Sequence, residues 1–161
     1  MTFLLRKDDV FAFAFSHYAD TVYRIALNNM RNNADAQDVT QEVFMRLLES
    51  SNIFKDSQHL KAWLIRVTIN LCHDEYKKNQ KITDAYTEIR DEAVFNESPV
   101  AEAVNSLPEN YRNAIYLHYY EGYTAKEIGK ILGAKENTVL SWLSRARQKL
   151  KEELAGGFDN E

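Results

Sequence analysis

The amino-acid sequence predicts an all-α protein with two small helical domains joined by a flexible acidic linker. Apolar residues recur at the helical spacings of three and four in both halves of the chain, and few segments alternate apolar with polar residues. Only 5 glycines and 2 prolines interrupt the 161 residues. The periodicity fades from Asn79 to Val100, so we expect one domain over residues 1–80, a linker over 81–100 and a second domain over 101–155.

Three amphipathic helices are expected in the first domain, each with one apolar stripe facing a shared core. Polar segments at residues 31–33 and 50–52 separate the three helices. The stripes are Phe11, Phe15, Tyr18, Val22 and Ile25 in the first helix, Ala36, Val39, Val43 and Leu47 in the second, and Leu60, Leu64, Val67 and Leu71 in the third. Three such helices with short connections predict a small bundle.

The third helix carries an unusual line of side chains beside its apolar stripe. One indole, two cations, one amide and one imidazole follow at spacings of three and four: Trp63, Arg66, Asn70, His73 and Lys77, with Lys61, Lys78 and Lys81 nearby. Cations interleaved with stacking and hydrogen-bonding groups are typical of surfaces that bind unpaired nucleic acid. A solvated basic face beside a partly buried tryptophan has the same pattern, and we expect most of the Trp63 ring to be buried.

The second helix has the opposite character on the face away from its stripe, where Asp38, Gln41, Glu42 and Met45 lie together. Acidic and amide groups repel DNA phosphates but suit a basic protein partner. An ordinary solvated helix face explains these residues equally well.

The second domain is expected to begin with a helix opened by Pro99. Pro108 suits the first turn of the next helix, which runs through Tyr111, Ile115 and Tyr119, and Gly122 ends that helix.

Residues Thr124 to Lys149 then predict a helix-turn-helix. Thr124 and Glu127 have the spacing of a capping box, and Gly133 supplies the positive φ at which the first helix stops. The second helix has an apolar stripe of Val139, Leu143, Ala146 and Leu150 and an opposite face of Ser141, Ser144, Arg145 and Gln148. Such a motif places its second helix in the DNA major groove, although a plain αα-hairpin has the same outline.

The net charge of −4 is unusual for a DNA-binding protein, but its distribution explains it. Residues 81–105 hold 2 basic and 6 acidic residues, whereas residues 1–80 hold 10 of each and residues 106–161 hold 8 of each. A basic footprint need only be local, so the balanced halves are compatible with DNA binding.

Several kinds of site and location are not indicated by the sequence. Cys72 is the only cysteine, so no internal disulfide is possible, and we expect it to be a small buried residue. The four histidines lack the spacing of metal ligands, and no cofactor, metal or catalytic residue is expected, so the protein is not an enzyme. No apolar run approaches the ~20 residues that cross a bilayer, and the first residues make a poor signal peptide, so we expect a cytoplasmic, nucleoid-associated protein.

Four segments together resemble bacterial sigma-70-type sigma factors, and the absence of further domains points to the small extracytoplasmic-function (ECF) group. The segments are DAQDVTQEVFMRLL, AWLIRVTINLCHDEYKK, LPENYRNAIYLHYYEGYTAKEIGKILG and NTVLSWLSRARQKL, and the resemblance runs from about Phe13 to Leu154. It implies a factor that binds core RNA polymerase, recognises the −35 and −10 promoter elements and promotes melting of the DNA for transcription initiation.

The resemblance assigns a role to three sets of residues. The first domain resembles region 2, whose contact with the β′ clamp helices falls on Asp38, Gln41, Glu42 and Met45. A base flipped from the −10 element and its strand would meet Lys55, Asp56, Ser57, Gln58, His59, Lys61, Arg66, Asn70, His73 and Lys77, within a loop spanning Phe54 to Lys61 and the helix after it. The second domain resembles region 4, whose −35 contacts fall on Lys135, Asn137, Thr138, Leu140, Ser141, Ser144, Arg145 and Gln148.

Further partners are also implied. They are the β flap of the polymerase, the nucleic-acid channels of the polymerase that the acidic linker would occupy, and an anti-sigma factor. No insertion into a membrane is implied.

Two positions depart from the family pattern in the predicted recognition helix. Family members often carry a basic residue where this chain has Leu140, and another where it has Trp142. Because Leu140 is apolar, we expect one phosphate or guanine contact to be absent, or to be replaced by contact with a thymine methyl group. Trp142 lies at the edge of the buried stripe, and in one interpretation it packs against its own domain instead of contacting DNA. Arg145 is therefore the best single candidate for a DNA contact, and we expect this domain to bind DNA weakly alone.

Two alternatives belong to other functional classes. A stand-alone helix-turn-helix regulator would bind its operator tightly without polymerase and would form a dimer or sense a ligand. A helical adaptor that binds only proteins would leave Arg145 and Arg66 dispensable.

Overall fold

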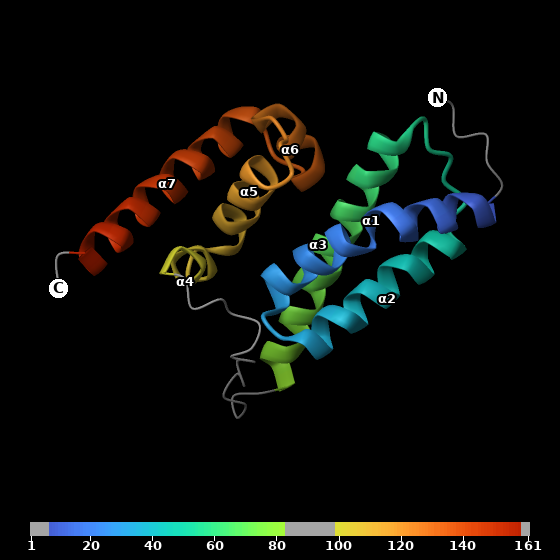
Figure 1. Ribbon diagram of the computed structural model, residues 1–161, viewed down its shortest axis with the longest axis horizontal. Coiled ribbons are helices and arrows are strands. Elements are labelled where there is room, and N and C mark those ends of the chain that lie inside the picture. The colour runs from blue at the N-terminus through green and yellow to red at the C-terminus, as the bar shows by residue number, and fades with distance from the viewer. Residues whose placement is uncertain (1–6, 83–98, 159–161) are drawn as a thin grey trace. The chain divides into compact units, whose positions relative to one another are not determined.

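The computed structural model describes residues 7–82 and 99–158, which form seven α-helices without a β-strand (Figure 1). These residues divide into two compact units, the N-terminal unit before residues 83–98 and the C-terminal unit after them. The predicted all-α fold is confirmed. The predicted flexible linker at residues 81–100 lies, apart from its two ends, outside the described residues. Among the described helices, none combines the length and the apolar character needed to cross a membrane.

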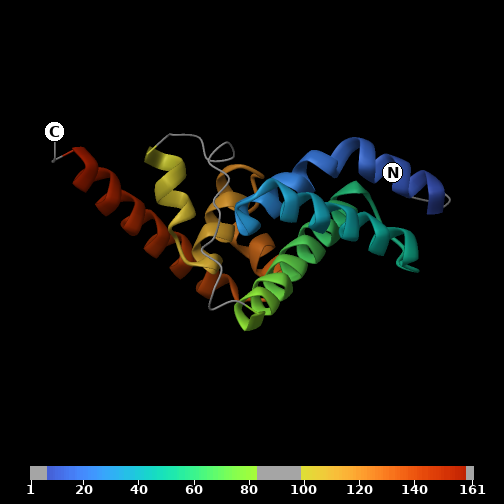
Figure 2. The same cartoon turned by 90° about the horizontal axis from the view of Figure 1, so that it is seen from below.

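The N-terminal unit is a three-helix bundle. It contains α1 (Lys7–Met30), α2 (Asn33–Glu49) and α3 (Ser57–Ile82). Figures 1 and 2 show α1 and α2 side by side, and α3 packs against both. The connection from α1 to α2 is shorter than expected, because Asn32 is the N-cap of α2 and its side chain accepts a hydrogen bond from the backbone N–H of Asp35 at 2.8 Å.

The core of this unit contains most of the predicted apolar stripes. All four stripe residues of α2 are buried, as are Val22 in α1 and Leu60, Leu64 and Leu71 in α3. Cys72 is buried as well, as the sequence predicts. Phe15, by contrast, is 54% exposed, and the prediction that it faces the core is wrong.

Phe44 of α2, which belongs to none of the predicted stripes, is buried. Its ring lies edge-on to Phe11 at 6.0 Å and to Phe15 at 5.3 Å between centroids. A helix that packs against two neighbours buries a second side, and the spacing within one stripe does not reveal that side. Phe44 therefore fills the seam between α1 and α2, while Phe15 covers the outer edge of that seam.

The C-terminal unit contains α4 (Pro99–Asn105), α5 (Glu109–Tyr119), α6 (Ala125–Leu132) and α7 (Glu136–Phe158). The first three helices all pack against α7. Pro99 opens α4 as predicted, but Pro108 is the N-cap of α5 rather than part of its first turn. The helix α5 runs through Tyr111, Ile115 and Tyr119 as predicted, and Tyr119 is exposed at its end, whereas Leu117 is fully buried.

Candidate nucleic-acid interface

The loop between α2 and α3, residues 50–56, is the first candidate contact with nucleic acid, and an aromatic anchor holds it to the bundle. Phe54 is only 5% exposed, and its ring meets those of His59 and Trp63 edge-on, at 5.4 and 5.6 Å between centroids. Its neighbour Ile53 is 85% exposed. The loop is thus fixed at Phe54 and presents the adjoining residues to solvent.

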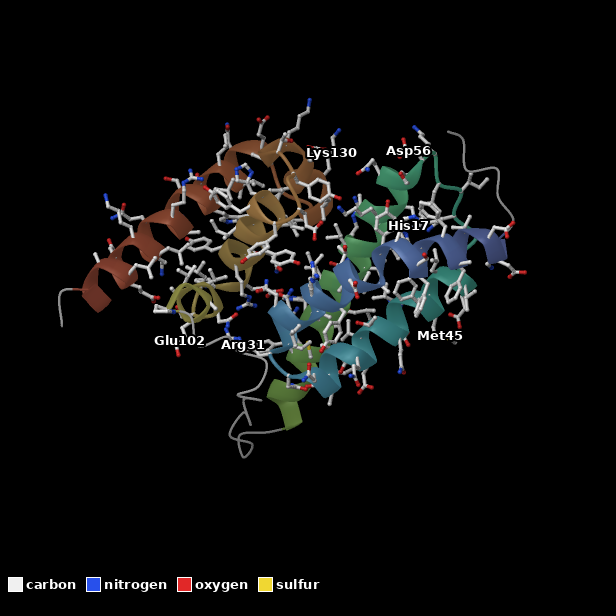
Figure 3. All side chains as sticks on the ribbon, in the orientation of Figure 1. His17, Arg31, Met45, Asp56, Glu102 and Lys130 are labelled. Carbon is white, nitrogen blue, oxygen red and sulfur yellow. The ribbon has the colours of Figure 1, made fainter. Side chains whose placement is uncertain are left out.

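Hydrogen bonds close the same loop onto the start of α3. Asp56, which lies where α3 begins (Figure 3), accepts a hydrogen bond from the backbone N–H of His59 at 2.8 Å. The backbone N–H of Lys55 donates to Nδ1 of His59 at 3.1 Å, and the Tyr18 hydroxyl donates to the carbonyl of Ser57 at 3.3 Å. Because Asp56 caps α3, the predicted loop is shorter than expected, and Ser57, Gln58, His59 and Lys61 already belong to the helix.

The predicted mixed stripe runs along the surface of α3. Arg66, Asn70 and Lys77 are exposed, while Lys61 and His73 are partly buried. Trp63 is also partly buried and packs against the hydrophobic core, as the sequence predicts. The structure therefore places cationic and amide groups on a helix that begins directly at the anchored loop.

The helix-turn-helix is the second candidate contact, and its first helix has the predicted capping box. The Thr124 hydroxyl accepts from the backbone N–H of Glu127 at 3.2 Å, and the Glu127 carboxylate accepts from the backbone N–H of Thr124 at 3.0 Å. Hydrogen bonding of the Glu127 carboxylate to Thr124, first to its backbone N–H and then to its side chain, lowers the pKa of that carboxyl below its ordinary value. Gly133 ends α6 with φ 70°, which confirms the predicted turn.

Gly129 is a residue of this motif that the sequence pattern did not single out. A Cβ atom at Gly129 would lie 2.5 Å from the carbonyl oxygen of Ala134, in the turn that leads to α7. The Ala134 N–H donates to the Gly129 carbonyl at 2.8 Å, which holds the two backbones together. The IGKILG segment contains this glycine, but only the path of the turn shows why a side chain does not fit.

Every residue predicted to contact the −35 element is exposed, Lys135 just before the second helix of the motif, α7, and the others on that helix. Val139, Leu143 and Ala146 are buried, and the side chains of the opposite face point away from that core. The exposed residues are Lys135, Asn137, Thr138, Leu140, Ser141, Ser144, Arg145 and Gln148. Leu140 is 47% exposed, whereas Trp142 is partly buried at the edge of the apolar stripe.

Two other cations of α7 are held by tyrosines of α5. Arg147 donates to the Tyr119 hydroxyl at 3.4 Å, and the Lys149 ammonium lies 5.9 Å from the centre of the Tyr111 ring. These contacts lie on either flank of the buried stripe. Arg145 therefore stands on the outward face between two cations that contact the body of the unit.

The acidic face of α2 is the third predicted surface, and its four residues are all exposed. Met45 is 50% exposed on this helix (Figure 3), and the Glu42 carboxylate pairs with Arg46 at 3.3 Å. Leu48, beside them on α2, and Phe15 on α1 are also exposed. This surface thus has an acidic part and an apolar part. Within the described residues, no group of three or more histidine, cysteine or carboxylate side chains has the arrangement of a metal site.

Residues 14–82 match the family model of sigma-70 region 2, and residues 98–150 match that of sigma-70 region 4. The chain is 35% identical over 152 residues to the ECF RNA polymerase sigma factor SigE of Mycolicibacterium smegmatis, with 86% of this chain and 59% of that protein covered. It is 28% identical over 167 residues to the ECF RNA polymerase sigma factor SigW of Bacillus subtilis, with 91% and 89% covered.

Two solved structures share the fold. The sigma factor RpoE of Bartonella quintana, in complex with the anti-sigma factor NepR, has a TM-score of 0.72 at 21% identity, with 90% of this chain and 96% of that one covered. CnrH, in complex with the cytosolic domain of CnrY, has a TM-score of 0.71 at 23% identity, with 91% and 88% covered.

Proposed function

Because the chain belongs to the sigma-70 family of RNA polymerase sigma factors, in its ECF group, we propose that it binds core RNA polymerase, recognises the −35 and −10 promoter elements and promotes melting of the −10 element. The observation that carries the proposal is the presence of region 2 and region 4, in that order, in one chain of 161 residues. We assign each proposed role to an exposed surface of one of the two regions.

The −35 element is assigned to the outward face of α7. Most of its exposed side chains are small or amide-bearing, and Leu140 offers a methyl-contacting surface rather than a charge. Arg145 supplies the main positive charge on this face, which supports a modest affinity of the C-terminal unit for DNA. Binding to polymerase then supplies the rest of the free energy of promoter recognition.

The −10 element is assigned to the loop at residues 50–56 and the mixed stripe of α3. Melting requires a pocket that binds the extruded base and cations that bind the backbone of its strand. We assign the exposed cations Lys55 and Arg66 to the strand, and the loop anchored at Phe54 supports this assignment. The acidic face of α2 is assigned to a basic surface of core polymerase, because its exposed carboxylates repel DNA.

An anti-sigma factor is proposed as a further partner. Of the two structural neighbours, RpoE is in complex with the anti-sigma factor NepR and CnrH with the cytosolic domain of CnrY. The exposed apolar residues Phe15, Met45 and Leu48 offer a surface that such a partner would cover. We place the action of the protein in the cytoplasm at the nucleoid, where core polymerase and promoter DNA are found.

Run-off transcription tests the proposed function directly. Purified core polymerase is supplied with a library of promoter fragments, with and without this protein, and transcript starts are mapped. We expect new starts downstream of a shared pair of sequence elements, together with a stable complex between the protein and core. If starts are not redirected and no complex forms, the proposal is wrong; tight DNA binding without polymerase would instead favour a stand-alone regulator.

Replacing Arg145 with alanine is expected to weaken dependence on the −35 element without loss of binding to core. Removal of an arginine that contacts a base edge costs about 1–3 kcal/mol in DNA recognition. Transcription from promoters with an intact −35 element should fall toward that from promoters with a scrambled one. Lys151→Ala, which removes one exposed charge farther along α7, is the control for net charge, and equal losses in both variants would contradict a specific contact.

A further inference from the structure

The α3 residue His59 has two hydrogen bonds that tie it to the preceding loop. We propose that His59 is a positioning residue for melting of the −10 element: its neutral imidazole closes the loop at residues 50–56 onto α3 and does not itself contact the DNA. The inference rests on the proposed function and deepens it. It also separates His59 from Lys55 and Arg66, which stay assigned to the DNA strand.

The direction of the hydrogen bond determines the state of the imidazole. The backbone N–H of Lys55 is always a donor, so the Nδ1 atom 3.1 Å away must accept and carries no proton. The proton of the neutral ring therefore lies on Nε2. The backbone N–H of His59 in turn donates to the Asp56 carboxylate at 2.8 Å. His59 and the two residues before α3 thus hold each other in a reciprocal arrangement similar to a capping box.

Ring contacts show which part of the loop this arrangement fixes. The imidazole lies edge-on to Phe54 at 5.4 Å, and Phe54 in turn meets Trp63 at 5.6 Å. The loop therefore has an apolar anchor at Phe54 and a polar closure at Lys55, and both involve His59. Without the Nδ1 acceptor, the Lys55 N–H turns to water and the direction of the exposed Lys55 side chain is no longer determined.

Two substitutions separate positioning from direct contact with DNA. In His59→Asn the side-chain oxygen stands two bonds from Cβ, as Nδ1 does in histidine, so the acceptor is kept while the outer half of the ring is lost. In His59→Phe the ring beside Phe54 is kept while the acceptor is lost. Circular dichroism of each full-length variant checks that the helices remain folded.

Exchange of the Lys55 amide hydrogen, measured by NMR on the free full-length chain, tests loop closure without polymerase or DNA. We expect about fivefold faster exchange in His59→Phe, the effect of losing one net hydrogen bond, and exchange close to wild type in His59→Asn. Equal exchange in wild type and His59→Phe would show that the imidazole does not close the loop.

Permanganate reactivity of unpaired thymines, with core polymerase and a responsive promoter, tests the role in melting. We expect His59→Phe to slow opening about fivefold, in proportion to the loss of the closed loop, and His59→Asn to open at nearly the wild-type rate. If both variants are slow although His59→Asn keeps its protected Lys55 amide, the imidazole touches the DNA and the positioning role is wrong. If the wild type opens no promoter, the proposed function fails with it, while the exchange result still decides loop closure.

Discussion

Replacing Gly129 with alanine is expected to destabilise the C-terminal unit by about 1–3 kcal/mol, the usual cost of overpacking a well-packed site. The new methyl group would lie 2.5 Å from the carbonyl oxygen of Ala134, which is backbone and has no rotamer to change. The turn must therefore move away from α6, and the hydrogen bond from Ala134 to Gly129 is strained or lost. Because this turn sets the start of α7, dependence on the −35 element should fall as well.

Gly156→Ala is the matched control for this prediction. Gly156 also lies within a helix, α7, but a Cβ atom there meets nothing within 4 Å. The same substitution should stabilise the protein at this site by about 0.5–1 kcal/mol, because alanine loses less backbone entropy than glycine on forming a helix. The expected changes in the free energy of unfolding thus have opposite signs in the two variants, which a general effect of alanine on helix formation does not explain.

The measurement can be confined to one unit, because the chain has 2 tryptophans, one in each unit. In a Trp63→Phe background, urea unfolding followed by Trp142 fluorescence reports the C-terminal unit alone. A midpoint for Gly129→Ala at or above that of the parent would show that the turn accommodates a side chain. In that case the close approach of the Gly129 and Ala134 backbones does not exclude a side chain at position 129.

Replacing Phe54 with alanine is expected to destabilise the N-terminal unit by about 3 kcal/mol, at the lower end of the range for a buried phenylalanine. The side chain is 5% exposed and belongs to the hydrophobic core of this unit. Its removal leaves a cavity beside Trp63 and frees the loop at residues 50–56 from its apolar anchor. Opening of the −10 element should therefore fail more severely than through loss of the His59 acceptor alone.

Ile53→Ala provides the control from the adjacent position. Ile53 is 85% exposed, so its truncation should change the free energy of unfolding by no more than about 0.5 kcal/mol. In a Trp142→Phe background, Trp63 fluorescence reports unfolding of the N-terminal unit for both variants. Equal stabilities for Phe54→Ala and Ile53→Ala would mean that Phe54 does not anchor the loop.

The features that the sequence predicted correctly depend on neighbours a few residues away. The capping box of Thr124 and Glu127, the turn at Gly133 and the start of α4 at Pro99 each involve atoms within one helical turn. The apolar stripe of α2 is equally local, because the residues on one side of a helix recur with the period of that helix. For the same reason, the exposure of the predicted −35 residues followed directly from the buried stripe of α7.

The candidate site was predicted as a set of residues but not as an arrangement. The sequence placed Phe54 to Lys61 in a loop, whereas the Asp56 cap begins α3 at Ser57. It gave no sign that the His59 ring closes that loop, because the bond to Lys55 requires the helix start to be known first. The roles of the individual residues in binding DNA and polymerase stay predictions for the experiments above.

The sequence by itself determined the helices, most of their ends and the family to which the chain belongs, since these depend on local spacing and on motifs in order. Only the tertiary structure decided that Phe44 rather than Phe15 fills the seam between α1 and α2, and that Gly129 must lack a side chain. Both depend on which segment lies alongside a residue. That is determined by close packing between helices distant in the chain or across a turn, and not by the period of any one helix.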